Sequence, residues 1–178
     1  MEKPIRLISV VGKKNSGKTT LVVALAAEFA RLGKVVGTLK HGTHPARLDT
    51  EGTDTWRHLN EGSAQRVLLE SSGSRVLIQR LEEEADPITL ARQYMRGTDI
   101  VIAEGFTSHP IPKIEVFRRE EHDEPHFHPS HPHAAQWIAM VTDHEAIDYP
   151  FPAFQFSDTA WLVTLSKLAR SRAMVVEE

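Results

Sequence analysis

The sequence predicts an α/β fold, in which a mostly parallel β-sheet is flanked by helices and carries an added β-hairpin. Two observations predict it. Short apolar runs rich in β-branched residues, typical of buried strands, alternate with segments whose apolar residues recur at helical spacing. In the middle of the chain, two further strand-like runs are separated only by a Ser-Ser-Gly-Ser turn. The length of 178 residues suits one domain with a full core.

The first part of the chain has the pattern strand, helix, strand. Residues 5–11 are mostly apolar and predict a buried parallel strand. A helix is expected over residues 20–32, where apolar side chains have helical spacing and Gly33 then favours a stop. A second strand is expected over residues 34–39. It follows the helix after one short turn, so we expect a right-handed β-α-β unit.

The middle of the chain is more polar. A loop is expected from Lys40 to about Thr53, followed by a short helix that ends near Gly62. Residues 64–70 and 75–79 then predict the two strands of the hairpin.

The second half returns to alternating strands and helices. A helix is expected from Pro87 to about Arg96, because proline favours the first helical turn. Three further strands are expected over residues 99–104, 113–117 and 136–141. A last helix is expected over residues 158–173. Parallel strands that alternate with helices make a layered α/β domain.

The most informative motif lies between the first strand and the first helix. Gly12 is followed by four residues and then by Gly17-Lys18-Thr19, which is the spacing of the phosphate-binding loop, G-x-x-x-x-G-K-[ST]. Glycines let several N–H groups turn toward a phosphate chain, the lysine supplies positive charge, and the threonine hydroxyl can bind Mg²⁺. The motif therefore predicts a P-loop NTPase fold and a single nucleotide-binding domain over residues 1–178. Its expected nucleotide contacts are Gly12, Lys13, Lys14, Asn15, Ser16, Gly17, Lys18, Thr19 and Thr20.

A carboxylate is expected on the metal side of the nucleotide. Ligands of a parallel sheet bind beyond the carboxyl ends of its strands, and the strand over residues 99–104 ends in Glu104. Glu104 suits a Mg²⁺ ligand, directly or through water, and a group that orients an attacking water; with Lys18 it is the catalytic candidate. Gly105 is positioned to offer a backbone N–H to the terminal phosphate. The alternative is that Glu104 only caps the next turn.

Two aspartates follow the second strand. Asp49 and Asp54 lie in the polar loop and at the start of the short helix, and either suits a Mg²⁺ ligand or a group acting on the attacking water. We assign Asp49 to the metal side. For Asp54 the alternative is a residue of the first helical turn, favoured there by the helix dipole.

Base recognition has one candidate in the sequence. Guanine recognition uses an aspartate at the end of a late strand, whose two oxygens accept the guanine N–H groups, and Asp143 follows the strand over residues 136–141. The usual Asn-Lys-x-Asp pattern is absent from the sequence. Asp143 is therefore either the guanine reader or a turn aspartate.

A histidine-rich segment, residues 122–133, contains five of the ten histidines of the chain: His122, His126, His128, His131 and His133. Such a density can bind Ni²⁺ or Zn²⁺. The spacing fits neither a helix face nor a closed zinc site, and three prolines keep the segment extended. We expect a mobile, solvated loop with adventitious metal affinity, which could also close over a nucleotide or a partner.

Composition excludes several classes of protein. The formal net charge of −3 gives no electrostatic case for binding nucleic acid or an anionic membrane. The chain has no Cys, which excludes disulfides and thiolate metal sites and favours the cytoplasm. No targeting segment is visible, and no apolar run approaches the roughly 18 residues that would span a membrane.

With these residues in view, the chain resembles the molybdopterin-guanine dinucleotide biosynthesis protein B family, the molybdenum cofactor guanylylation adaptors. The resemblance covers most of the chain, and its parts are more specific together than the phosphate loop alone. They are residues 12–20, 39–41, 49–57, 104–106 and 111–115. The histidine-rich segment is not part of the family pattern.

The resemblance implies a homodimeric GTP-binding protein with weak GTPase activity. It implies an accessory role toward a separate guanylyltransferase that joins GMP to molybdopterin. By resemblance, Lys18 and Thr19 contact phosphate and Mg²⁺, and Glu104 is the second residue on the metal side. The hairpin region is expected to help form the dimer, with Lys113 near the shared groove. No glutamine or arginine is clearly placed to assist hydrolysis, which agrees with weak turnover.

Two other functions use the same loop. A metallochaperone GTPase that delivers nickel would store metal in residues 122–133, although such proteins usually keep a Cys or His site near the phosphate loop and carry a terminal histidine tract. A small-molecule kinase would bring an arginine-bearing lid; Arg118 and Arg119 could serve, but no clear lid helix follows them.

Overall fold

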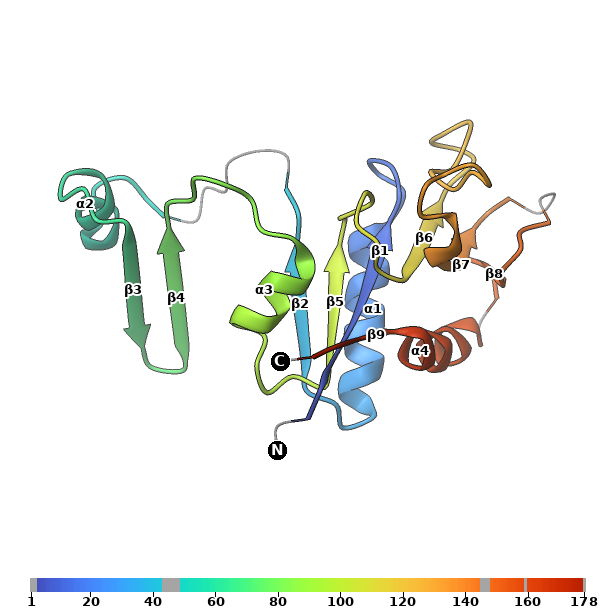
Figure 1. Ribbon diagram of the computed structural model, residues 1–178, viewed down its shortest axis with the longest axis horizontal. Helices are drawn as coiled ribbons and strands as arrows, with labels where there is room; N and C mark the ends of the chain where they lie inside the picture. The colour runs from blue at the N-terminus through green and yellow to red at the C-terminus, as the bar shows by residue number, and fades with distance from the viewer. Residues whose placement is uncertain (1–2, 43–48, 145–147, 159, 178) are drawn as a thin grey trace. The chain divides into compact units, whose positions relative to one another are not determined.

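The computed structural model describes residues 3–42, 49–144, 148–158 and 160–177 (Figure 1). The chain forms two compact units. The larger unit comprises the chain up to His41 and from Asp86 onward, and the smaller unit comprises Gly42–Ala85. The smaller unit is therefore an insertion between the second strand and the third helix of the chain.

The larger unit is built on a mostly parallel sheet, as the sequence predicted. In the described residues its order is β2-β5-β1-β6-β7-β8, and β9 pairs with β1. All pairings are parallel except that of β9, which runs antiparallel to the first half of β1. The strands are β1 (Ile5–Val11), β2 (Val36–Lys40), β5 (Ile100–Glu104), β6 (Lys113–Phe117), β7 (Trp137–Thr142), β8 (Ala153–Gln155) and β9 (Met174–Val176).

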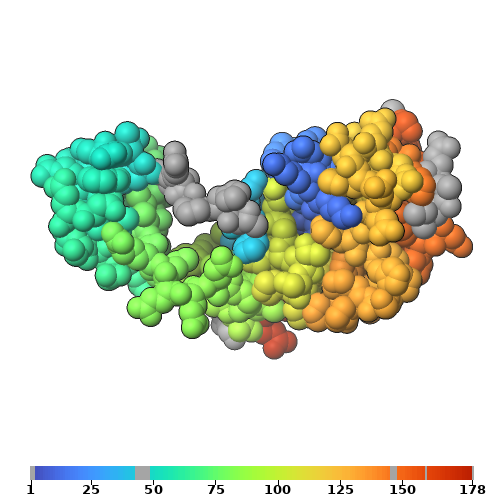
Figure 2. Space-filling view, turned by 90° about the horizontal axis from the view of Figure 1, so that it is seen from above, coloured from blue at the N-terminus to red at the C-terminus, as the bar shows by residue number. Residues whose placement is uncertain are grey.

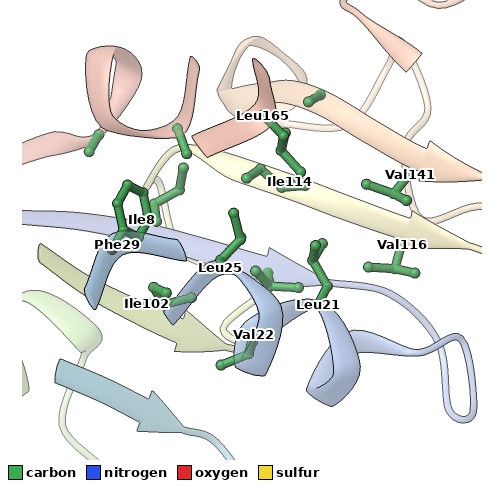
Figure 3. Close-up of a cluster of buried hydrophobic side chains, with 14 of the residues drawn as sticks. Ile8, Leu21, Val22, Leu25, Phe29, Ile102, Ile114, Val116, Val141 and Leu165 are labelled. Carbon is green, nitrogen blue, oxygen red and sulfur yellow. The ribbon is translucent and has the colours of Figure 1, made fainter. Parts of the chain in front are cut away.

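Helices cover both faces of this sheet (Figure 1). One face packs against α1 (Lys18–Arg31) and α4 (Trp161–Arg172), and the other packs against α3 (Pro87–Tyr94). Strand β1 divides its side chains between them, because alternate residues of a strand point to opposite faces. Ile8 lies in the cluster with Leu25 of α1, where Figure 3 shows the interlocked side chains, and Leu7 lies in the cluster with Ala91 of α3.

Local signals explain where the helices begin. Helix α1 starts directly after Gly17, whose φ of 98° turns the chain out of the phosphate loop. Helix α3 starts at Pro87, and Asp86 caps it by accepting hydrogen bonds from the N–H groups of Ile88 and Thr89. Both starts lie within two residues of the positions expected from the sequence.

The smaller unit contains the predicted hairpin. Strands β3 (Arg66–Ser71) and β4 (Ser74–Gln79) pair antiparallel around the Ser-Ser-Gly-Ser turn. Helix α2 (Asp54–Asn60) precedes them, and the Thr53 hydroxyl caps its start by accepting from the Trp56 N–H. The hairpin and the short helix are confirmed.

Three features of the sheet were not predicted. Strand β5 lies between β1 and β2, so the first two strands of the chain share a sheet without being neighbours. Strands β8 and β9 were missed because each has only three residues, which is too short for a periodic pattern. Strand β9 follows α4 after Ala173 and pairs with the first residues of β1.

Candidate functional site

The predicted phosphate loop lies between β1 and α1 in the larger unit. Gly12 has a φ of 146°, and a Cβ there would lie 2.3 Å from the backbone oxygen of Val116, so no other residue fits. Asn15 adopts the left-handed region with a φ of 62°, which asparagine tolerates better than most residues. The loop is thus tightly folded, as phosphate binding requires.

Two side chains of the loop are prepared for an anion. Ser16 is fully buried, and its hydroxyl has no hydrogen-bond partner in the part of the chain that the structure describes. The Lys18 ammonium donates to the backbone oxygen of Lys13 at 2.6 Å. Burial lowers the pKa of Lys18 below its ordinary value, while the negative charge of Glu104 acts in the opposite direction. An orphaned hydroxyl and a partly desolvated cation both favour a bound phosphate.

Glu104 contacts the loop directly. The Thr19 hydroxyl lies 3.0 Å and 3.1 Å from the two carboxylate oxygens of Glu104, and the Lys40 ammonium lies 3.1 Å from one of them. The sheet register explains the cluster, because Glu104 is paired with Val10 on one side and with Lys40 on the other. A threonine hydroxyl and a carboxylate are oxygen ligands of the kind that Mg²⁺ prefers, so these residues fit the metal.

The turn after Glu104 is strained and tightly held. Phe106 is buried and has a φ of 57°, a conformation that is costly for a bulky residue and is found mostly at functional sites. The Ser9 hydroxyl donates to the Gly105 oxygen at 2.6 Å, and the Gly105 N–H donates to the Val10 oxygen at 2.9 Å. The Gly105 N–H is therefore engaged by β1, which differs from the expectation that it would face the terminal phosphate.

The carboxyl ends of β6, β7 and β8 bring further residues toward the loop. Arg118, directly after β6, donates from Nε to the Ser16 oxygen at 3.2 Å, and its guanidinium lies 4.3 Å from the centre of the Phe156 ring. Asp143, directly after β7, accepts the Arg119 N–H at 2.7 Å through Oδ1. Its Oδ2 is buried and has no hydrogen-bond partner among the described residues.

Arg118 was not predicted as a neighbour of the phosphate loop. Arg118 directly follows a strand of the parallel sheet, and a position at the end of such a strand is also what identified Glu104 as a site residue. That signal is available in the sequence, but only the order of the strands shows that β6 lies beside β1.

Asp49 and Asp54 lie in the smaller unit. The Asp49 carboxylate accepts the Thr53 hydroxyl at 2.8 Å and the Thr50 N–H at 2.9 Å. These hydrogen bonds hold the pKa of Asp49 below its ordinary value, and the bond from the Thr53 hydroxyl has the largest effect. Asp54 is the first residue of α2. Residues 43–48, the rest of the predicted polar loop, lie outside the described residues.

The histidine-rich segment is anchored, which differs from the expected mobile loop. Glu115 of β6 is fully buried, and its carboxylate accepts the N–H groups of His126 at 2.5 Å and Phe127 at 2.9 Å, and the indole N–H of Trp137 at 2.8 Å. Burial raises the pKa of Glu115 above its ordinary value. In the described ranges of the chain, no group of three or more His, Cys, Asp or Glu side chains is arranged to hold a metal ion.

Comparison with known proteins gives one consistent result. A family model described as MobB, molybdopterin guanine dinucleotide synthesis protein B, matches residues 7–143. The chain is 36% identical over 124 residues to a molybdopterin-guanine dinucleotide biosynthesis adapter protein of Haemophilus influenzae, which covers 67% of each chain. It is 33% identical over 122 residues to a probable adapter protein of the same description from Bacillus subtilis, which covers 67% of this chain and 69% of the relative.

The fold is similar to a solved structure as well. The crystal structure of a MobB protein homolog from Bacillus stearothermophilus matches with a TM-score of 0.69 and 26% identity, over 93% of this chain and 99% of that chain. The helices that the structure describes are all too short or too polar to span a bilayer. Since the family model matches residues 7–143 of the chain, the protein belongs to the MobB family.

Proposed function

We propose that this protein is a GTP-binding adapter of molybdopterin guanine dinucleotide biosynthesis. In this role it assists a separate guanylyltransferase that joins GMP to molybdopterin. The relatives named above carry the biosynthetic role in their names. The observation that supports nucleotide binding most directly is the tight phosphate loop beside the Thr19–Glu104 contact.

In this proposal the loop residues bind the phosphates and Lys18 neutralises their charge. Thr19 and Glu104 hold Mg²⁺, which neutralises charge on the phosphate oxygens when it is bound. The Thr19 hydroxyl donates its proton to Glu104, so its oxygen lone pairs would be the part of the group that holds the metal. Lys40 holds the carboxylate in place from the side of β2.

Weak hydrolysis follows from the same contacts. A general base needs a lone pair that can accept a proton from the attacking water. The two oxygens of Glu104 accept from the Thr19 hydroxyl, and one of them also pairs with the Lys40 ammonium, so the lone pairs of this carboxylate are engaged by protein groups. Glu104 therefore serves metal binding better than water activation, and we propose a slow GTPase.

We propose Asp143 as the reader of the guanine base. One carboxylate oxygen is held by the Arg119 N–H, which orients the group, and the other is a buried acceptor without a partner in the described chain. Guanine presents two N–H donors on its Watson–Crick edge, whereas adenine presents an acceptor at the equivalent ring nitrogen. A buried carboxylate oxygen therefore favours GTP over ATP.

We propose that a second copy of the chain covers the hairpin. Leu68 and Leu77 are paired across the hairpin and are 60% and 41% exposed, and Leu69 and Val76, which pair on the opposite face, are 46% and 39% exposed. An isolated two-stranded hairpin is marginally stable in water, and apolar side chains on both faces call for a partner surface. This observation supports the homodimer.

The test is calorimetric titration of GTP, with and without Mg²⁺, followed by capture of the guanylyltransferase on the immobilised protein. The proposal expects GTP binding that strengthens with Mg²⁺, little binding of ATP, and retention of the guanylyltransferase. A protein that binds neither nucleotide would overturn the nucleotide role. A protein that binds GTP but does not retain the guanylyltransferase would overturn the adapter role.

A further inference from the structure

We propose that His122 and His126 are positioning residues for nucleotide binding, which hold the phosphate loop by its backbone carbonyl oxygens. The inference rests on the proposed nucleotide function and deepens it. It assigns a role to the histidine-rich segment, which the phosphate-loop motif does not include. The role differs from metal storage, because the rings act on the loop itself.

The contacts come from the first half of the segment. The His122 Nε2 lies 2.6 Å from the Lys14 oxygen. The Gly12 backbone acts on the His126 ring as a hydrogen-bonding group that raises the pKa of the ring. Arg118, just before the segment, donates to the Ser16 oxygen at 3.2 Å. In Figure 2 the golden surface of this part of the chain lies against the blue surface of the phosphate loop.

These contacts act on the conformation that binds phosphate. In a phosphate loop the N–H groups converge on the anion, so the carbonyl oxygens point away from it. A donor that holds a carbonyl oxygen therefore fixes the peptide plane whose N–H faces the nucleotide. Fixing the loop before the nucleotide arrives lowers the conformational entropy lost on binding.

The segment that carries the histidines is itself fixed. Glu115 is paired with Val11, the residue before Gly12, and its carboxylate accepts the His126 and Phe127 N–H groups. The Phe127 ring packs at 5.9 Å from the Trp137 ring and at 4.8 Å from the Phe151 ring. His126 is therefore held from the sheet through Glu115. The His122 N–H donates to the oxygen of Arg118, the residue that follows β6, at 3.0 Å.

Hydrogen bonding accounts for the role without a charged imidazole. Burial lowers the pKa of the His126 ring below its ordinary value. The Gly12 backbone acts in the opposite direction, and the nearby Lys13, Lys18 and His122 act in the same direction as burial. A neutral imidazole still donates one N–H, which is sufficient for a carbonyl oxygen. A side-chain amide can replace such a donor.

The test compares GTP affinity in the presence of Mg²⁺ for the full chain and four variants. His122→Ala is expected to weaken binding about 2- to 12-fold, the range that corresponds to one net hydrogen bond. The double variant His122→Ala/His126→Ala is expected to weaken it further. His122→Gln, whose amide can donate at the same place, is expected to restore affinity to within about twofold of the unmodified chain.

The control is His128→Ala. The His128 ring is exposed and contacts Ser130 within the segment, so its loss should leave GTP affinity unchanged. Unchanged affinity in a folded double variant, while the unmodified chain binds GTP, would overturn this inference and leave the proposed function intact. An unmodified chain that does not bind GTP would overturn both.

A second measurement applies if the double variant does not fold. The ring proton signals of His122 and His126 in the unmodified chain are followed by NMR during titration with GTP and Mg²⁺. They are expected to shift, because the peptide groups that they contact meet the nucleotide, whereas the His128 signal stays in place. Stationary His122 and His126 signals at saturating GTP would contradict the inference.

Discussion

The hydroxyl of Thr19 bridges the two carboxylate oxygens of Glu104 at 3.0 Å and 3.1 Å, across 85 residues of sequence. The contact joins the first residues of α1 to the end of β5. It places a hydroxyl and a carboxylate, two oxygen ligands, beside the phosphate loop, with the Lys40 ammonium as the charge partner of the carboxylate.

The first prediction concerns the loop lysine. Lys18→Ala removes the charge-assisted contact to the phosphates and should weaken GTP binding about 10- to 150-fold, the range for hydrogen bonds to charged groups. The fold should survive, since among the described residues the Lys18 side chain donates only to the nearby Lys13 oxygen. Calorimetry measures the affinity. Lys167→Ala, at an exposed position of α4, is the control. Equal GTP binding by both variants would exclude the loop as the phosphate site.

The second prediction concerns the metal side. Glu104→Gln keeps the shape of the side chain and its contact with Thr19 but removes the negative charge that a divalent cation needs. GTP affinity should then lose most of its dependence on Mg²⁺ concentration, while binding in EDTA changes little. Glu121→Gln, at an exposed position, is the control. If Mg²⁺ strengthens GTP binding equally in all three proteins, Glu104 does not serve the metal.

The third prediction concerns the base. Asp143→Asn retains an oxygen for the Arg119 N–H but can replace the buried Oδ2 acceptor by an amide donor. Affinity for GTP should fall about 10- to 150-fold, the range for a hydrogen bond to a charged group, and affinity for ATP should change far less. Competition of both nucleotides with a fluorescent GTP analogue measures the ratio. A variant that still prefers GTP to the same degree would place base recognition elsewhere.

Part of this site could be predicted from the sequence because its signals are local. The spacing of Gly12, Gly17 and Lys18, and the position of Glu104 at the end of an apolar run, need no knowledge of distant residues. The Lys40–Glu104 pair needs the register of β2 on β5, which is a long-range pairing. Apolar patterns indicate that two runs are strands, but not which strand lies between which.

The anchoring of the histidine-rich segment could not be predicted from the sequence for a different reason. Every residue of β6 is buried, including Lys113 and Glu115, although their charges suggest exposed positions. Glu115 is buried because it accepts hydrogen bonds from the segment and from Trp137, and those partners lie 11 to 22 residues away. Prolines and histidines in a polar stretch predict a loop correctly but not its attachment.

The fourth prediction concerns pH. Lys113 is fully buried, and burial lowers its pKa from 10.5 to about 8 in the folded protein. Above pH 8 the unfolded chain therefore binds more protons at this residue than the folded one, so the free energy of unfolding should rise with pH. The slope approaches about 1.4 kcal/mol per pH unit for one proton. Below pH 8 both states are protonated and the contribution is constant.

Urea unfolding between pH 7.5 and pH 9.5 measures this slope. The upper limit avoids Tyr149, whose pKa burial raises to about 12, because that residue reverses the trend once the unfolded tyrosine ionises. Lys113→Met removes the titrating group and should flatten the curve relative to the unmodified chain. Identical slopes in the two proteins would show that Lys113 titrates normally.

The fifth prediction concerns the hairpin of the smaller unit. Leu68 and Leu77 face each other across β3 and β4 on the same side of the hairpin, and they are 60% and 41% exposed. Leu68→Lys places a charge on this surface without changing the strand pairing, since the side chain points away from the backbone ladder. If a second copy covers the surface, the buried ammonium should shift the protein from dimer to monomer at micromolar concentration.

Sedimentation equilibrium of the unmodified chain and of the Leu68→Lys variant measures the fraction of dimer. Val23→Lys is the matched control, because Val23 is 63% exposed on α1 in the larger unit and lies outside the hairpin. It should leave the dimer intact. A Leu68→Lys variant that remains dimeric would place the interface elsewhere, and an unmodified chain that is monomeric at these concentrations would contradict the proposed homodimer. GTP affinity, measured on the same samples, then shows whether nucleotide binding depends on the second copy.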